Sequence, residues 1–93
     1  MDAEREKAQE LLQQAVESFR HATEHNDPQY AAEAFYNRSK AHWRLWRLTE
    51  DPEEFQKALA DGQTAATRSY DHRFVSWNEF LKENPLQRLS VSV

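Results

Sequence analysis

A ladder built mostly from small residues occurs twice in this chain of 93 residues, at one fixed offset. The first copy is Ala15, Phe19 and Ala22, and the second is Ala58, Gly62 and Ala65, each 43 positions after its counterpart. Spacings of four and three residues place the members of a ladder on one stripe of a helix, where small side chains let a neighbouring backbone approach closely. The ladders therefore predict two helices with related packing. A repeat of helix pairs at this period is typical of arrays that present a surface rather than perform chemistry.

The composition around the ladders favours helices over strands. One Gly and three Pro leave long uninterrupted stretches, and each Pro follows an Asp or an Asn. The mean hydropathy of −1.01 is polar for so short a chain. Three Trp, three Tyr and five Phe compensate, because each buried aromatic side chain removes roughly 150–250 Å² from water. The sequence therefore predicts one small all-α domain.

Charge and cysteine usage exclude several classes of protein. The formal net charge is −4, and the 16 acidic and 12 basic residues are intermingled, which disfavours nucleic-acid binding. The chain has no Cys, which excludes disulfides and thiolate metal sites. It has no apolar stretch near Met1 and no apolar run long enough to span a membrane. We therefore expect a soluble, cytoplasmic protein without a membrane segment.

Prolines and capping residues divide the chain into four expected helices. Asp-Pro pairs at 27–28 and 51–52 are helix starts, because Asp can cap and Pro at the first helical position lacks only an N–H that would be unpaired anyway. Glu54 lies three residues after Asp51, which is the spacing of a capping box. Asp71 is the expected cap of the last helix, and Asn84, which precedes a Pro, is expected to end it. The expected antiparallel helices are residues 2–25, 28–49, 52–69 and 72–83, in one domain over 1–84 with a tail over 85–93.

The apolar positions of these helices predict the core. We expect the buried residues to include Phe19, Phe35, Trp46, Ala58, Trp77 and Phe80. They come from all four expected helices, so the same core would hold all four together.

The two ladders also resemble a known family. Segments 15–22 and 58–65 are similar to the second helix of the tetratricopeptide repeat, with Gly62 at the aromatic position of the second segment. Segment 32–42 is similar to the first helix of such a repeat, and the resemblance spans about residues 8–81. It implies an α-solenoid fragment of helix-turn-helix units that bind peptides and proteins.

Particular positions refine this resemblance. Phe35, Ser39 and His42 match the family's aromatic, small and second aromatic positions, whereas Arg38 stands where Leu is usual. The offset is longer than the common repeat and is nearer the roughly 42-residue repeats of the kinesin-light-chain type. A four-helix bundle with the same spacing is the alternative.

The strongest candidate site is a basic and aromatic stripe within 28–49. Its members are Tyr36, Lys40, Trp43, Arg44 and Arg47, which share one side of a helix. Trp and Arg carry much of the energy of protein interfaces, and Arg can bind a carboxylate with two hydrogen bonds. The resemblance places this stripe in the ligand groove. In the alternative, the aromatic rings pack on a neighbouring helix and only the cations reach solvent.

A second cluster lies near residue 25. His21 and His25, four apart with Glu17 nearby, have a spacing that can hold zinc, but the set is too poor to predict a metal site. Arg20 and His25 also resemble the Arg-x4-His signature of HEPN ribonucleases, which would make them a catalytic pair. Five residues turn a helix by about 500°, which would separate the two side chains unless the helix frays there.

The sequence thus predicts a non-catalytic interaction module, an adaptor without a cofactor or metal. It would bind an acidic protein or peptide through the stripe, and an RNA-cleaving protein or a small structural bundle are the alternatives. The first expected helix lacks a polar cap on its outer face, so we also expect self-association, for example as a homodimer.

Overall fold

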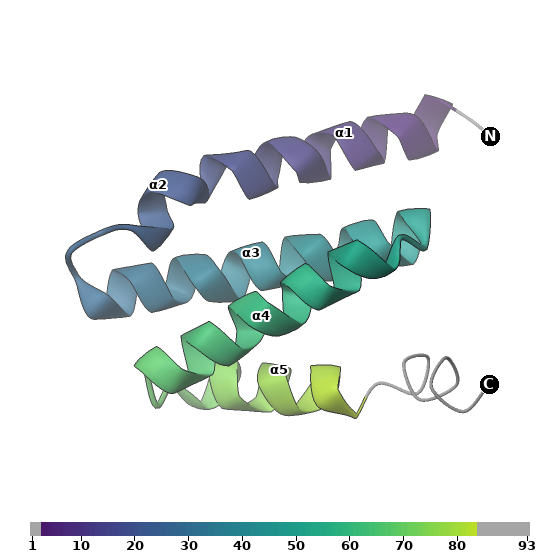
Figure 1. Ribbon diagram of the computed structural model, residues 1–93. Helices are drawn as coiled ribbons and strands as arrows, with labels where there is room; N and C mark the ends of the chain where they lie inside the picture. Colours follow the sequence, from purple (N-terminus) through teal and green to yellow (C-terminus); the bar gives the residue numbers. More distant parts are fainter. Residues whose placement is uncertain (1–2, 84–93) are drawn as a thin grey trace.

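The computed structural model describes residues 3–83, and it shows an all-α fold (Figure 1). The helices are α1 (Ala3–Ser18), α2 (Arg20–Thr23), α3 (Pro28–Thr49), α4 (Pro52–Arg68) and α5 (His72–Lys82). The described part contains no strand. The fold class is therefore confirmed, whereas the expected tail at 85–93 lies outside the described residues.

The predicted helix starts are confirmed by their capping geometry. The carboxylate of Asp27 accepts hydrogen bonds from the backbone N–H groups of Gln29 and Tyr30, at 2.9 and 3.3 Å. Asp51 and Asp71 cap α4 and α5 in the same way. These bonds satisfy donors at the helix N-terminus that have no intrahelical partner. The starts of the three later helices thus follow from local chemistry.

The first expected helix is wrong in one respect, because it is interrupted at Phe19. The N–H of Phe19 is shared between the carbonyl oxygens of Ala15 and Val16, at 3.2 and 3.3 Å. The Ser18 hydroxyl donates to the Ala15 carbonyl at 2.8 Å. Phe19 keeps right-handed helical dihedral angles (φ −81°, ψ −11°), so the interruption is a local distortion. A short second segment, α2, continues to Thr23.

The central helix of the fold is α3. In Figure 1, α1 lies along one side of α3, α4 crosses it in front, and α5 lies below α4. Close backbone contacts join α1 to α3, α3 to α4 and α4 to α5. Buried residues of α3, α4 and α5 form two small core clusters, around Phe74 and around Phe55. By contrast, α1 has no buried residue, so α3, α4 and α5 make the tighter part of the molecule.

The second ladder lies where the helices approach most closely. Ala58 and Ala65 are fully buried. A Cβ atom added at Gly62 would lie 3.0 Å from the Leu81 side chain and 3.2 Å from the Ser39 hydroxyl. The small residues of α4 therefore allow α3 and α5 to approach closely, as their spacing predicts. The first ladder is only half-buried, because α1 packs on one helix rather than two.

The predicted core is right at Ala58 but wrong at Phe80. Phe80 is 44% exposed, whereas Phe74 and Leu81 are the buried side chains of α5. Phe74 and Leu81 are seven residues apart and lie on one side of the helix, and Phe80 is turned about 100° away from Leu81. The other predicted core residues are half-buried: Phe19, Phe35, Trp46 and Trp77.

Candidate partner-binding surface

The structure brings the predicted basic and aromatic stripe together along α3. The ammonium of Lys40 lies 4.9 Å from the centre of the Tyr36 ring, and the guanidinium of Arg47 lies 5.3 Å from the Trp43 ring. Each cation therefore covers an aromatic face, an attractive arrangement. Arg44 lies beside them and is exposed.

The aromatic rings of this stripe pack on α5 rather than facing solvent. The Tyr36 ring lies 4.9 Å from the Phe74 ring, and Trp43 contacts Trp77 and Phe80 with ring centres 5.7 Å apart in each case. Tyr36 and Trp43 are half-buried. These contacts agree with the alternative in which the rings are structural and the cations reach solvent.

The part of the stripe open to a partner is therefore its cationic strip, Lys40, Arg44 and Arg47. Among residues 3–83, no carboxylate lies within ion-pairing distance of any of the three. Arg73 of α5 is different, because it is paired with Glu33 and Asp71 at 3.1 and 2.8 Å. The strip thus carries three cations outside any ion pair with residues 3–83, of which Arg44 and Arg47 are exposed and Lys40 is partly exposed, on a chain that is acidic overall.

The pairing of Arg73 also affects the cap of α5. The Arg73 guanidinium and backbone N–H both donate to Asp71, which lowers the pKa of this carboxyl group to about 2. The same contacts, together with Glu33, raise the pKa of Arg73. This arrangement links Glu33 of α3 to α5, and the single guanidinium partly offsets the charges of two carboxylates.

A polar contact between α3 and α4 was not predicted from the sequence. Arg38 donates two hydrogen bonds to the carboxylate of Asp61, at 2.8 and 3.0 Å, and this contact raises the pKa of Arg38. His42 Nδ1 lies 2.7 Å from Glu54 Oε1, and His42 Nε2 lies 3.9 Å from Asp61 Oδ2. Glu54 is therefore paired with α3 rather than completing the expected capping box with its side chain.

This polar contact lies largely inside the fold. His42 is only 7% exposed. Ser39, next to it on α3, donates to the Ala58 carbonyl at 2.6 Å and accepts from Trp77 Nε1 at 2.8 Å. These bonds link α3 to α4 and α5. A signal was present in the sequence: Arg38 at a position where the resemblance expects Leu, and Asp61 beside the second ladder.

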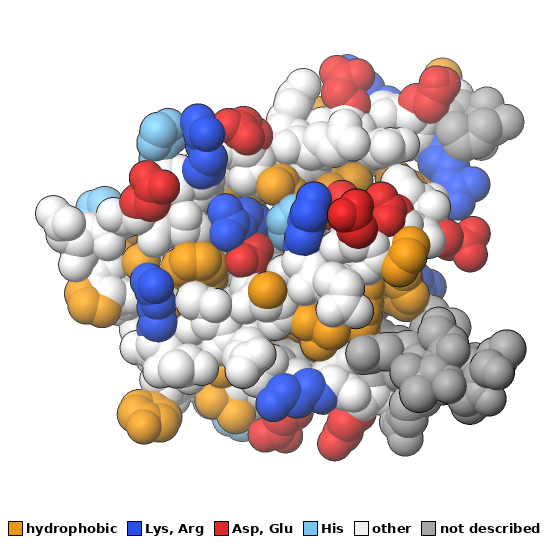
Figure 2. All heavy atoms as spheres, in the orientation of Figure 1, with side chains coloured by type: hydrophobic (Ala, Val, Ile, Leu, Met, Phe, Trp, Pro, Cys, Tyr) orange, Lys and Arg blue, Asp and Glu red, His pale blue; other side chains and the backbone are white. Residues whose placement is uncertain are grey.

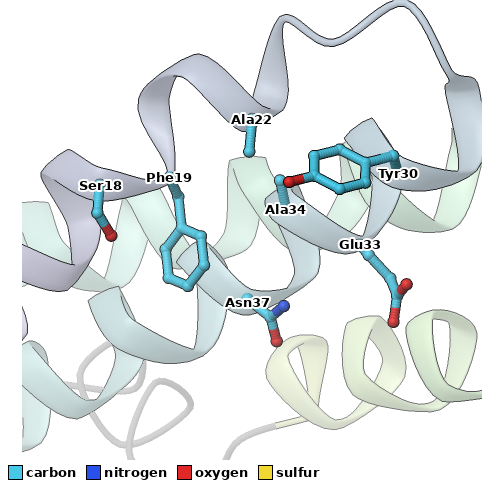
Figure 3. A pocket seen from close by; sticks show the side chains of 7 residues that line it. All are labelled: Ser18, Phe19, Ala22, Tyr30, Glu33, Ala34 and Asn37. Carbon is cyan, nitrogen blue, oxygen red and sulfur yellow. The ribbon is translucent and has the colours of Figure 1, made fainter.

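A cavity that the sequence reasoning missed lies between α1, α2 and α3 (Figure 3). It has a volume of about 340 Å³ and is lined by Ser18, Phe19, Ala22, Tyr30, Glu33, Ala34 and Asn37. The Phe19 ring projects from the junction of α1 and α2 toward α3, and the Tyr30 ring lies across Ala34. Its lining comes from α1, Phe19, α2 and α3, and the packing of these segments on one another is not given by the helical pattern of any one of them.

The residues of the ribonuclease and zinc hypotheses lie beside this cavity. Arg20 pairs with Glu17 at 3.3 Å, and both are exposed. His25 lies beyond the end of α2, where its Nδ1 accepts from the Asp27 N–H at 3.0 Å and its ring contacts Tyr30 at 4.4 Å. Because His25 lies outside the helix, the helical rotation between positions 20 and 25 does not determine how its side chain lies relative to Arg20. Residues 3–83 contain no group of three or more His, Asp or Glu arranged to hold a metal ion.

Comparison of the chain with protein families, with curated proteins and with solved structures finds no match.

None of the helices in the described part is long and apolar enough to cross a membrane. Acidic and basic side chains are intermingled on the face shown in Figure 2, where α4 lies in front.

Proposed function

We propose that this chain is a non-catalytic interaction module, which binds an acidic peptide or protein partner through the cationic strip of α3. The observation that supports this most directly is the lack of a carboxylate partner for Lys40, Arg44 and Arg47 within residues 3–83. Exposed cations with free hydrogen-bond donors favour a partner that supplies carboxylates.

The aromatic rings beneath the strip support the same proposal. Lys40 and Arg47 are each positioned over a ring that is itself packed on α5. A cation that is already positioned loses less conformational freedom when it binds a carboxylate, so a larger share of the contact energy remains as affinity. Arg is also among the residue types that dominate interface energetics.

The architecture is compatible with a tetratricopeptide-like array, and we keep that relationship, a cytoplasmic adaptor role and self-association as proposals. The face of α1 away from α3 is not covered by any described helix, and Leu11 on α1 is 53% exposed. An uncovered helix face of this kind in a repeat fragment favours docking onto another copy or onto further repeats.

Fluorescence anisotropy with a labelled acidic probe tests the proposal. The probe is a helical peptide of about fifteen residues with Glu on one face. We expect it to bind the wild-type chain, and we expect Arg44→Glu with Arg47→Glu to weaken binding at least about tenfold, since attraction becomes repulsion. The matched control, Lys7→Glu with Lys57→Glu, makes the same change in net charge at exposed positions on α1 and α4 and should leave binding unchanged.

Two results would contradict the proposal. Equal loss of binding in the control would mean that net charge alone, and not the strip, attracts the probe. Cleavage of added RNA by the wild-type chain that is lost in His25→Ala would favour the ribonuclease alternative. Circular dichroism of each variant shows whether the helices are retained.

A further inference from the structure

The cationic strip and the cavity lie on one continuous stripe of α3. Glu33 and Asn37, which line the cavity, are followed by Lys40, Arg44 and Arg47. The spacing is four, three, four and three residues, which keeps all five on one side of a helix. None of the five is buried. A ligand that lies along α3 therefore meets the cavity at one end and the strip at the other.

The cavity combines apolar walls, which can receive an anchor side chain, with polar lining groups from Ser18, Glu33 and Asn37. Its walls include the rings of Phe19 and Tyr30, and its floor includes Ala34 (Figure 3). Its volume of about 340 Å³ is at the small end of the range of about 300–1,000 Å³ for ligand pockets. The one carboxylate in the lining, Glu33, is paired with Arg73. Because Glu33 already has a partner, a ligand does not have to supply a cation here. The apolar walls can therefore receive one large apolar side chain of the ligand.

The walls of this cavity are held in place before any ligand arrives. Tyr30 is 54% exposed, yet its ring contacts the ring of His25, whose Nδ1 accepts from the Asp27 N–H. Phe19 is fixed at the junction of two helical segments and is half-buried. Preorganised walls favour binding, because less freedom is lost on association.

We infer, on the basis of the proposed function, that the ligand is an amphipathic acidic helix with one apolar anchor residue in this cavity. Asn37 and Arg44 are two turns apart on α3, about 10.5 Å. A ligand helix alongside α3 therefore carries its carboxylates about two turns from its anchor. Helix-in-groove binding of this kind depends on a few anchor side chains at helical spacing.

Two peptides that differ at one residue test the inference. Both carry Glu at positions about two turns from the anchor position, which is Leu in one peptide and Ala in the other. We expect the Leu peptide to bind the full chain about tenfold more tightly, from the burial of one leucine side chain. Tyr30→Ala should remove this difference, since it deletes one wall, and Ala22→Leu should also remove it by filling the cavity. The matched control is Tyr70→Ala, because Tyr70 is 97% exposed and does not line the cavity.

The outcomes separate the inference from the proposed function. Suppose that both peptides bind the wild-type chain equally and that neither binds the Arg44→Glu, Arg47→Glu variant. The strip then binds acidic partners, but the anchor inference is wrong. A preference for Leu that survives both Tyr30→Ala and Ala22→Leu would also overturn the inference, because the anchor would then lie elsewhere. If neither peptide binds the wild-type chain, the proposed function and the inference both fail.

Discussion

At the scale of single residues, Arg38 and Asp61 form one of the polar contacts that join α3 to α4. Their two hydrogen bonds are 2.8 and 3.0 Å long, and Asp61 is buried. Removing one partner from such a pair leaves the other charge without compensation in a place of low dielectric constant. Replacing both by apolar residues removes that penalty.

We therefore predict opposite results for single and double substitutions at this pair. Asp61→Leu should lower the free energy of unfolding by about 3 kcal/mol, whereas Arg38→Leu with Asp61→Leu should recover most of that loss. Urea denaturation of the four proteins in this cycle measures the coupling. Equal destabilisation by the single and double variants would show that the pair does not act as a unit.

Asp71 gives a prediction for pH. Its pKa is about 2 in the folded chain, below the ordinary value of 3.8, because Arg73 donates to it. The folded state therefore gains stability from this carboxylate above about pH 3.8 and loses that contribution as the pH falls through about 2. An NMR titration of the Asp71 carboxyl group should show the low pKa, and Arg73→Gln should raise it toward 3.8. An unchanged pKa in that variant would contradict the assigned cause.

At the scale of helices, the sequence predicts what depends on local chemistry and misses what depends on tertiary contacts. The Asp-Pro pairs at 27–28 and 51–52 locate two helix starts, because capping and proline geometry act within a few residues. The interruption at Phe19, where the backbone N–H is shared between two carbonyl oxygens, is not marked by a Pro or a Gly. The cavity beside it depends on how α1 and α2 pack on α3, which is a tertiary feature. Phe80 was misplaced because the sequence does not tell which side of α5 meets α4.

The close packing of α4 gives a prediction at Gly62. Ala in place of Gly stabilises an exposed helix by about 1 kcal/mol. Here the added methyl group would meet Leu81, which is fully buried, and the Ser39 hydroxyl, which is held by two hydrogen bonds. We expect Gly62→Ala to lower the free energy of unfolding by about 1–2 kcal/mol. Thermal unfolding of Gly62→Ala is compared with that of Ala60→Gly, a change at an exposed position of the same helix. A Gly62→Ala variant that is more stable than the wild type would contradict the prediction and would mean that the helices can move apart.

At the scale of the whole molecule, the packing is uneven. The buried residues come mainly from α3, α4 and α5, whereas α1 contacts α3 but contributes no buried residue of its own. The cavity lies between α1, α2 and α3, and the cationic strip continues from it along α3. The proposed binding surface and the contacts of α3 with α4 thus involve different sides of the same helix.

The uncovered side of α1 gives a prediction for self-association. We expect the wild-type chain to sediment as a dimer at micromolar concentration, and Leu11→Glu to shift it to a monomer, because Leu11 is the exposed large apolar residue of α1. Lys7→Glu, at an exposed position of the same helix, is the control for added charge. A wild-type chain that sediments as a monomer would refute this prediction without affecting the binding proposal.

We propose that the stripe of α3 formed by the cavity residues and the cationic strip binds an acidic partner. Chemical-shift mapping by NMR during titration with the acidic Leu peptide tests this proposal, because it reports every backbone amide at once. We expect shifts concentrated at Lys40, Arg44 and Arg47 and at the cavity residues Tyr30 and Asn37, with little change over the exposed face of α4. Shifts concentrated on α4, or no shifts on α3 at saturating peptide, would contradict it.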